Sequence, residues 1–179
     1  WRRWCIANNC GGSRDMFHQE YPANPDEAFL HSGSGVFDNA LVIRRREEAA
    51  QVAKGGYVVM DAAKPAAVLI ATGSEVATLV EGAELLAAEG IPVRVVNVPS
   101  EGLFRDQPRS YQESVLPAGV ARYGMTSGLP VNLRGLVGEN GVIHGLDHFG
   151  WSAPYKVLDE KFGYNGATVA AEVKKMLGK

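Results

Sequence analysis

The glycine, serine and acidic residue at Gly73-Ser74-Glu75 form the first stretch of this 179-residue sequence whose types could support chemistry. They follow a short apolar run and precede a helical pattern, so backbone N–H groups there could bind an anion at a helix N-terminus. The carboxylate of Glu75 opposes a phosphate placed nearby, and the stretch is neither a dinucleotide fingerprint nor a phosphate-binding loop. Ordinary capping by Ser74 is therefore favoured, and a small-anion or nucleotide-binding regulatory turn at Gly73, Ser74 and Glu75 is the alternative.

Asp147 and His148 are adjacent and suggest the base of a catalytic triad. Neighbouring residues of an extended segment point to opposite faces, so Asp147 is poorly placed to orient His148. No nucleophile elbow of the G-x-S-x-G type occurs either. We therefore predict that His148 is a loop residue packing by Phe149 and Trp151, and that the chain carries no catalytic residue. The serines considered as nucleophiles are Ser74, Ser100 and Ser152.

Two cysteines and two histidines near the start of the chain could bind a metal ion. The candidate ligands are Cys5, Cys10, His18 and His31. Structural zinc usually has histidines roughly three to five residues apart. His18 and His31 are much further apart than that, so no metal site is predicted.

The elements that must position these groups can be predicted from hydrophobic spacing. The unbroken apolar run 66–71 is typical of a strand buried on both faces. A helical pattern follows from Val76 to Ala87, Gly90 ends it, and 93–98 is a second β-rich run. Strand, helix and strand in this order predict a right-handed βαβ unit.

Further elements continue the alternation of strands and helices, which predicts a three-layer α/β/α domain. After a short polar loop that follows Pro99-Ser100, a helix is expected over Pro108–Leu116. We also expect Ser152 to cap a helix with Pro154 in its first turn. The remaining expected elements are strands at Val120–Met125 and Gly141–Leu146, an ambiguous helical turn within Leu129–Val137, a stop near Gly163, and a last helix over Thr168–Leu177.

Composition sets wider limits on function. The net charge is −2, from 18 basic and 20 acidic residues, which gives no electrostatic case for nucleic acid or an acidic membrane. No apolar segment approaches the ~20 residues of a membrane span. Two cysteines cannot form a disulfide framework, so a reducing, cytoplasmic location is expected. The chain begins with Trp1, from which a fragment or a processed product is expected.

From about residue 56 to the end, the sequence resembles the C-terminal domain of transketolase. The resemblance implies a mostly parallel, mixed five-stranded sheet with helices on both faces. One departure is Met125-Thr126-Ser127-Gly128, where the family usually has an acidic residue. The stretches that carry the resemblance are Gly55–Val58, Ile70–Glu75, Val98–Ser100 with Phe104, Tyr111–Pro117, Val137–Gly141, Gly145–Pro154 and Phe162-Gly163.

This resemblance implies a structural, dimer-supporting role rather than catalysis. Full-length transketolases of the pentose phosphate pathway transfer a ketol unit between sugar phosphates, using thiamine diphosphate and a divalent metal. Their N-terminal and middle domains hold these cofactors and the catalytic residues, and the enzymes are homodimers. We therefore expect no cofactor and no catalytic residue in this chain, and we expect it to be inactive alone.

Residues 1–40 resemble a stretch of the large terminase subunit of tailed phages. The quoted stretches are Phe17–Pro22, Asn24–Leu30, Ser32-Gly33 and Val36–Asp38. This resemblance implies a poorly packed appendage, a junction within 41–55, a domain over 56–179, and a chimeric or misassembled origin. A phage DNA-packaging accessory fragment is the third functional alternative, although no phosphate-binding loop or nuclease-like acidic cluster is present.

Overall fold

The computed structural model describes residues 1–14, 17, 21 and 50–179. Contacts divide the chain into two units, Trp1–Ala50 and Gln51–Lys179, which are described separately. None of the helices in the described residues combines the length and the apolar character needed to cross a bilayer.

In the first unit, a helix is formed by Arg2–Asn8 (α1). Cys5, Cys10 and Phe17 are buried together in a small cluster. No disulfide joins Cys5 to Cys10. The histidines of the zinc hypothesis, His18 and His31, lie outside the described residues, as does most of the terminase-like stretch.

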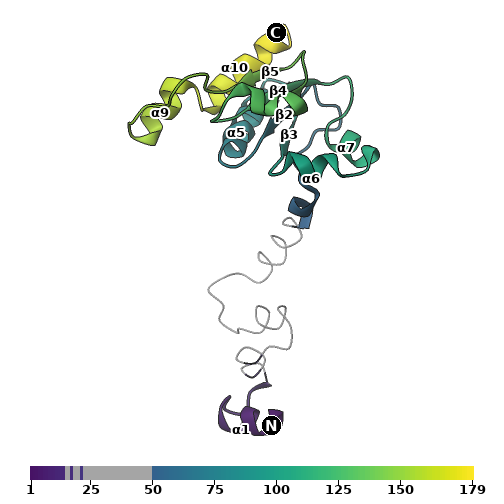
Figure 1. Ribbon diagram of the computed structural model, residues 1–179, viewed down its shortest axis with the longest axis vertical. Helices are drawn as coiled ribbons and strands as arrows, with labels where there is room; N and C mark the ends of the chain where they lie inside the picture. Colours follow the sequence, from purple (N-terminus) through teal and green to yellow (C-terminus); the bar gives the residue numbers. More distant parts are fainter. Residues whose placement is uncertain (15–16, 18–20, 22–49) are drawn as a thin grey trace. The chain divides into compact units, whose positions relative to one another are not determined.

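The second unit is built on one five-stranded sheet (Figure 1). Its order is β1-β3-β2-β4-β5, in which β1 is antiparallel to β3 and the other neighbours are parallel. The mixed, mostly parallel sheet expected from the sequence is confirmed. The strands are β1 (Tyr57–Met60), β2 (Ala67–Ala71), β3 (Val93–Asn97), β4 (Ala121–Met125) and β5 (Val142–His144).

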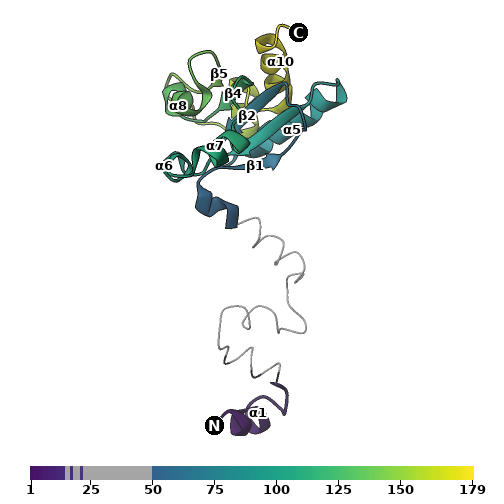
Figure 2. The same cartoon turned by 90° about the vertical axis from the view of Figure 1, so that its right-hand side faces the viewer.

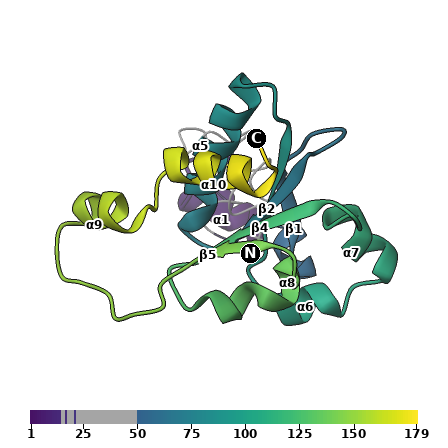
Figure 3. The ribbon, with the colours of Figure 1, turned by 90° about the horizontal axis from the view of Figure 1, so that it is seen from above.

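The central strand β2 explains the three layers. Every one of its residues is fully buried, and successive side chains enter opposite apolar clusters. Leu69 packs with α5 (Glu75–Ala88) and α10 (Gly166–Met176) on one face. Ile70 packs on the other face with residues of α6 (Glu101–Arg105), α7 (Arg109–Val115) and α8 (Arg134–Val137). Figures 2 and 3 show these two helix layers on either side of the sheet.

Helices α5 and α10 approach closely because glycines lie at their contact. A Cβ at Gly82 would lie 2.5 Å from a methyl carbon of Val169, and one at Gly166 would lie 2.8 Å from Cβ of Glu81. Larger residues at these two positions would push the helices apart. The helix predicted after β2 and the helix predicted at the C-terminal end are both present, as α5 and α10. They pack together in one layer.

Two local expectations, for the loop after Ser100 and for the helix near Ser152, needed correction, and two other segments are defined by the structure. The polar loop expected after Ser100 contains helix α6, because the Ser100 hydroxyl accepts a hydrogen bond from the N–H of Leu103 (3.3 Å). The ambiguous stretch is a 3₁₀ helix, Pro130–Leu133 (η2), followed by α8. The helix expected to begin near Ser152 is Tyr155–Phe162 (α9), with Pro154 at its N-cap and no side-chain cap. A further 3₁₀ helix, Gln51–Lys54 (η1), precedes β1.

Candidate functional site

The carboxyl ends of β2, β4 and β5 lie at one edge of the sheet (Figure 3). Open α/β sheets usually place their ligand sites at this edge. The turn after β2 contains the predicted anion-binding residues, and Thr126 directly follows β4. His144 is the last residue of β5.

The turn at Gly73, Ser74 and Glu75 differs from the expected cap. Ser74 occupies the N-cap position of α5, but its hydroxyl donates to the Glu75 carboxylate (3.3 Å) instead of accepting from the helix. Burial, and then the nearby Glu75 carboxylate, raise the pKa of Tyr164 to about 12. A negative charge thus lies beside the helix N-terminus and competes with any incoming anion. Anion binding at this turn stays a prediction.

A partly buried polar network at the same edge was missed by the sequence reasoning. The Nδ1 of His144 lies 3.2 Å from both carboxylate oxygens of Glu172 in α10, and its Nε2 lies 2.8 Å from the carbonyl oxygen of Phe162. Tyr123 of β4 donates its hydroxyl to Glu172 (2.7 Å). We call these contacts the His144 clamp, since they join two strands to α10 and to the end of α9.

The protonation state of the clamp follows from its partners. Both nitrogens of His144 face acceptors, so the ring satisfies both contacts only as an imidazolium. The hydrogen bond to Glu172 raises the pKa of His144, against a smaller opposing effect of burial. The same hydrogen bond lowers the pKa of Glu172. The sequence signal that could have found this pair was a histidine in a predicted strand and a glutamate in a predicted helix.

Among the described residues, His148 does not form a catalytic triad with Asp147 and a serine. The Nδ1 of His148 lies 2.8 Å from the carbonyl oxygen of Phe149, and its ring packs near Trp151 and Phe162. In the described part of the chain, no hydrogen bond or ion pair joins His148 to Asp147 or to a serine. The expected packing against the Phe149 ring is wrong, because that side chain is 96% exposed.

An exposed aromatic segment extends from this edge of the sheet. Residues 146–163, here called the aromatic arm, comprise a loop and helix α9, and Figure 3 shows them projecting beyond the sheet. Helix α9 has no buried residue. Within the arm, Trp151 packs only partly, with its ring centroid 5.2 Å from that of Phe162. The exposed large side chains are Phe149 (96%), Trp151 (58%), Tyr155 (69%) and Val157 (55%).

This arrangement suits binding better than catalysis. Soluble proteins rarely expose several large apolar side chains on one segment unless the segment meets a partner. The clamp lies close to both ends of the arm, because His144 is two residues before its first residue and contacts the carbonyl oxygen of Phe162 near its last. The exposed apolar side chains of the arm are therefore held at this edge of the sheet by the His144 clamp.

Comparisons with known proteins agree with the fold and the resemblance. The family described as the transketolase-like TK C-terminal domain matches residues 55–165. A plasmid transketolase of Cupriavidus necator is 44% identical over 134 residues, and transketolase 1 of Escherichia coli is 44% identical over 136. Each match covers 75% of this chain and 20% of the relative, so the chain spans about a fifth of their length.

Solved structures give the same result. Transketolase from Leishmania mexicana superimposes with a TM-score of 0.67 at 33% identity, covering 72% of this chain and 19% of that one. A transketolase from Pichia stipitis has the same TM-score at 29% identity, covering 74% and 19%. The comparisons do not support the terminase-like resemblance of residues 1–40.

Proposed function

The chain belongs to the transketolase family through its C-terminal domain, and on this premise we propose that it supports the assembly of a transketolase-like enzyme without carrying catalytic residues. Its partners in this proposal are the N-terminal and middle domains, which correspond to the length of the relatives beyond this match. In the assembled enzyme the domain would support a homodimer. The reaction assigned to that enzyme is ketol transfer between sugar phosphates.

The aromatic arm is the observation that carries this proposal. Its side chains are exposed although both faces of the sheet are already covered by the chain's own helices. The arm therefore offers apolar area that folding of this domain does not use. A surface on the remaining four fifths of a transketolase chain is the occupant proposed for it.

The described residues of this chain do not fit the cofactors of the family. Within the described ranges, no group of three or more His, Cys, Asp or Glu side chains is placed to hold a metal ion. A thiamine diphosphate site needs a divalent cation to neutralise the diphosphate, and the described residues offer no group of ligands that would bind one. We therefore place both cofactors on the partner domains.

A pull-down experiment tests the docking. The 179-residue chain is mixed with transketolase 1 of Escherichia coli truncated before its own C-terminal domain. We expect a complex that Trp151→Ser weakens by about tenfold or more, as for a buried aromatic anchor. Leu85→Ser is the control, because Leu85 is similarly exposed (46%) but lies on α5. Equal binding by all three proteins would contradict the proposal.

An activity assay tests the absence of catalysis. The purified chain is incubated with xylulose 5-phosphate, ribose 5-phosphate, thiamine diphosphate and magnesium. We expect no turnover. Measurable ketol transfer by this chain alone would overturn the assignment of catalysis to the partner domains.

A further inference from the structure

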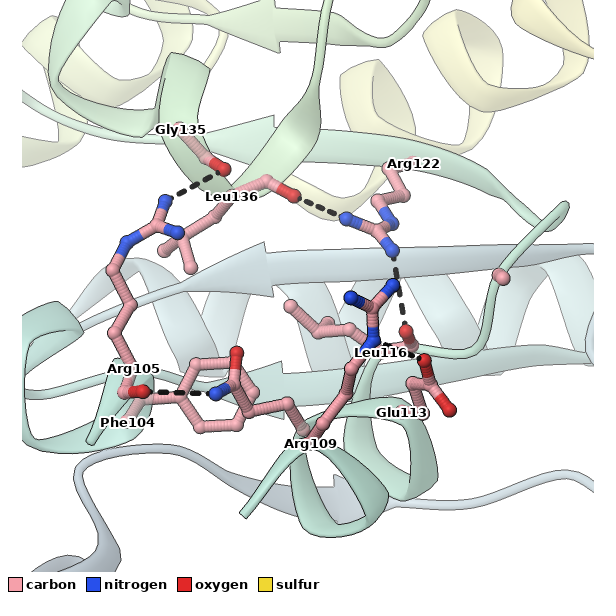
Figure 4. A pocket seen from close by; sticks show the side chains of 10 residues that line it. Phe104, Arg105, Arg109, Glu113, Leu116, Arg122, Gly135 and Leu136 are labelled. Atoms are coloured by element: carbon pink, nitrogen blue, oxygen red, sulfur yellow. Dashed lines mark hydrogen bonds and ion pairs between the residues drawn. The ribbon is translucent and has the colours of Figure 1, made fainter. Parts of the chain in front are cut away.

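A cavity of about 320 Å³ lies on the face of the sheet covered by α6, α7 and α8 (Figure 4). This volume is at the lower end of the range typical of small-molecule sites. Three arginines from three different elements line it. Arg105 ends α6, Arg109 begins α7 and Arg122 lies in β4. The apolar part of the lining is Phe104, Leu116 and Leu136.

Arg122 has a charge that no carboxylate balances within the described residues. Its Nη1 donates to the carbonyl oxygen of Leu136 (2.7 Å), and its Nη2 donates to that of Leu116 (3.2 Å). Burial lowers the pKa of Arg122, which shows the cost of keeping this guanidinium partly out of water. A guanidinium has five N–H donors, so two carbonyl contacts leave donors for another acceptor.

Arg109 adds a second positive charge on the same side of the cavity. Its Nε donates to Glu113 (2.8 Å), and Figure 4 shows its terminal nitrogens pointing toward Arg122. Two guanidinium groups that face one another repel unless an anion lies between them. The side chain of Arg109 is 89% exposed, so a ligand can reach it from solvent.

Arg105 completes the lining from the opposite side. Its Nε donates to Glu101 (2.7 Å) and its Nη2 to the carbonyl oxygen of Gly135 (2.9 Å). The cavity and these ion pairs thus hold three guanidinium groups against the two carboxylates of Glu101 and Glu113. The chain as a whole has a net charge of −2, so the excess of positive charge is local to this cavity and is not a general property of the surface.

We propose that this cavity binds a small phosphorylated compound, with its phosphate between Arg109 and Arg122. The planar guanidinium fork matches phosphate oxygens in pairs, and the apolar lining accepts the uncharged part of the ligand. This site is separate from the aromatic arm and does not depend on the proposed docking. Sequence reasoning missed it because the three arginines lie in a predicted loop, helix and strand with no shared motif.

Titration calorimetry at low ionic strength tests the site with inorganic phosphate, ribose 5-phosphate and adenosine monophosphate. We expect binding of at least one of them, weakened about tenfold in Arg109→Gln, as expected for loss of a charged hydrogen bond. Lys174→Gln is the matched control, because Lys174 is also paired with a glutamate, Glu89, but lies on α10. Its affinity should equal that of the wild type.

The ligands distinguish the source of recognition. Equal affinities for the three ligands show that the phosphate alone is recognised, whereas tighter binding of one ester shows that the apolar lining contributes; both support the site. No binding at millimolar concentration overturns the proposal. Equal weakening in Arg109→Gln and Lys174→Gln also overturns it, because that result shows only general attraction.

A second variant tests the opposite side without removing a charge. A Cβ at Gly135 would lie 2.7 Å from Nη2 of Arg105, so Gly135→Ala displaces this guanidinium. We expect weaker binding of the preferred phosphate ligand by a few-fold. Unchanged affinity in both Arg109→Gln and Gly135→Ala would exclude this cavity as the binding site.

Discussion

Replacing His144 by phenylalanine is expected to destabilise the domain by about 2–3 kcal/mol near pH 6. The substitution keeps an aromatic ring next to Tyr164, whose ring centroid lies 5.0 Å away, but it removes both donors. A hydrogen bond to a charged group contributes about 1.5–3 kcal/mol. The lower part of this range applies to the Glu172 contact, because that side chain is 35% exposed. Leaving the Phe162 carbonyl without its partner adds a further cost of about 1 kcal/mol.

The loss should depend on pH in a defined direction. The pKa of His144 is raised above its ordinary value of 6.5, so the stability it contributes is complete below that value and is lost as pH rises through the folded-state pKa. The pKa of Glu172 is lowered from 4.5, so its contribution is present above 4.5 and is lost as pH falls through the folded-state pKa. The clamp is therefore strongest between these two values.

Urea unfolding followed by circular dichroism at about pH 6 and about pH 9 measures this effect. We expect the wild type to lose stability between the two conditions and His144→Phe to lose less. His148→Phe is the control, since His148 is exposed and contacts a carbonyl rather than a carboxylate. The same pH dependence in the wild type and in His144→Phe would refute the reasoning.

Two further predictions concern packing. Gly82→Ala should lower the free energy of unfolding by about 1–2 kcal/mol in urea titrations, because overpacking against Val169 outweighs the ~1 kcal/mol gain in helix propensity. The matched change Gly102→Ala, where a Cβ meets nothing within 4 Å, should stabilise or leave stability unchanged; a stabilised Gly82→Ala would contradict the close contact. The isolated chain should also self-associate at high concentration in analytical ultracentrifugation. Replacing both Phe149 and Trp151 by serine should reduce this self-association. A wild-type chain that stays monomeric would contradict the idea that the aromatic arm is free to bind another surface.

The central part of the fold could be predicted because its signals are local. The apolar run around Leu69 has no alternation, and this indicates burial on both faces, which the structure confirms. The helix that follows ends before Gly90, whose φ of +75° few other residues adopt. The parallel pairing of β2 and β3 then follows from the crossover.

Short elements and side-chain contacts could not be predicted in the same way. Helix α6 has only five residues, so no hydrophobic period could develop, and the polar residues after Ser100 favoured a loop. His144 and Glu172 are 28 residues apart and meet only because α10 packs across the sheet. The arginines of the cavity likewise converge through tertiary structure, which local spacing does not encode.

The length of the connection between β5 and α10 supports the binding role of the arm. Connections in α/β folds usually need about two to six residues, whereas the segment between His144 and Asn165 includes a whole helix, α9. That helix buries no residue, so it adds little to the stability of this domain. The clamp nevertheless bonds to the carbonyl of Phe162 at its end and orders a segment that the core does not need. Ordering an exposed segment costs conformational entropy, and docking on a partner surface is the step that compensates for this cost.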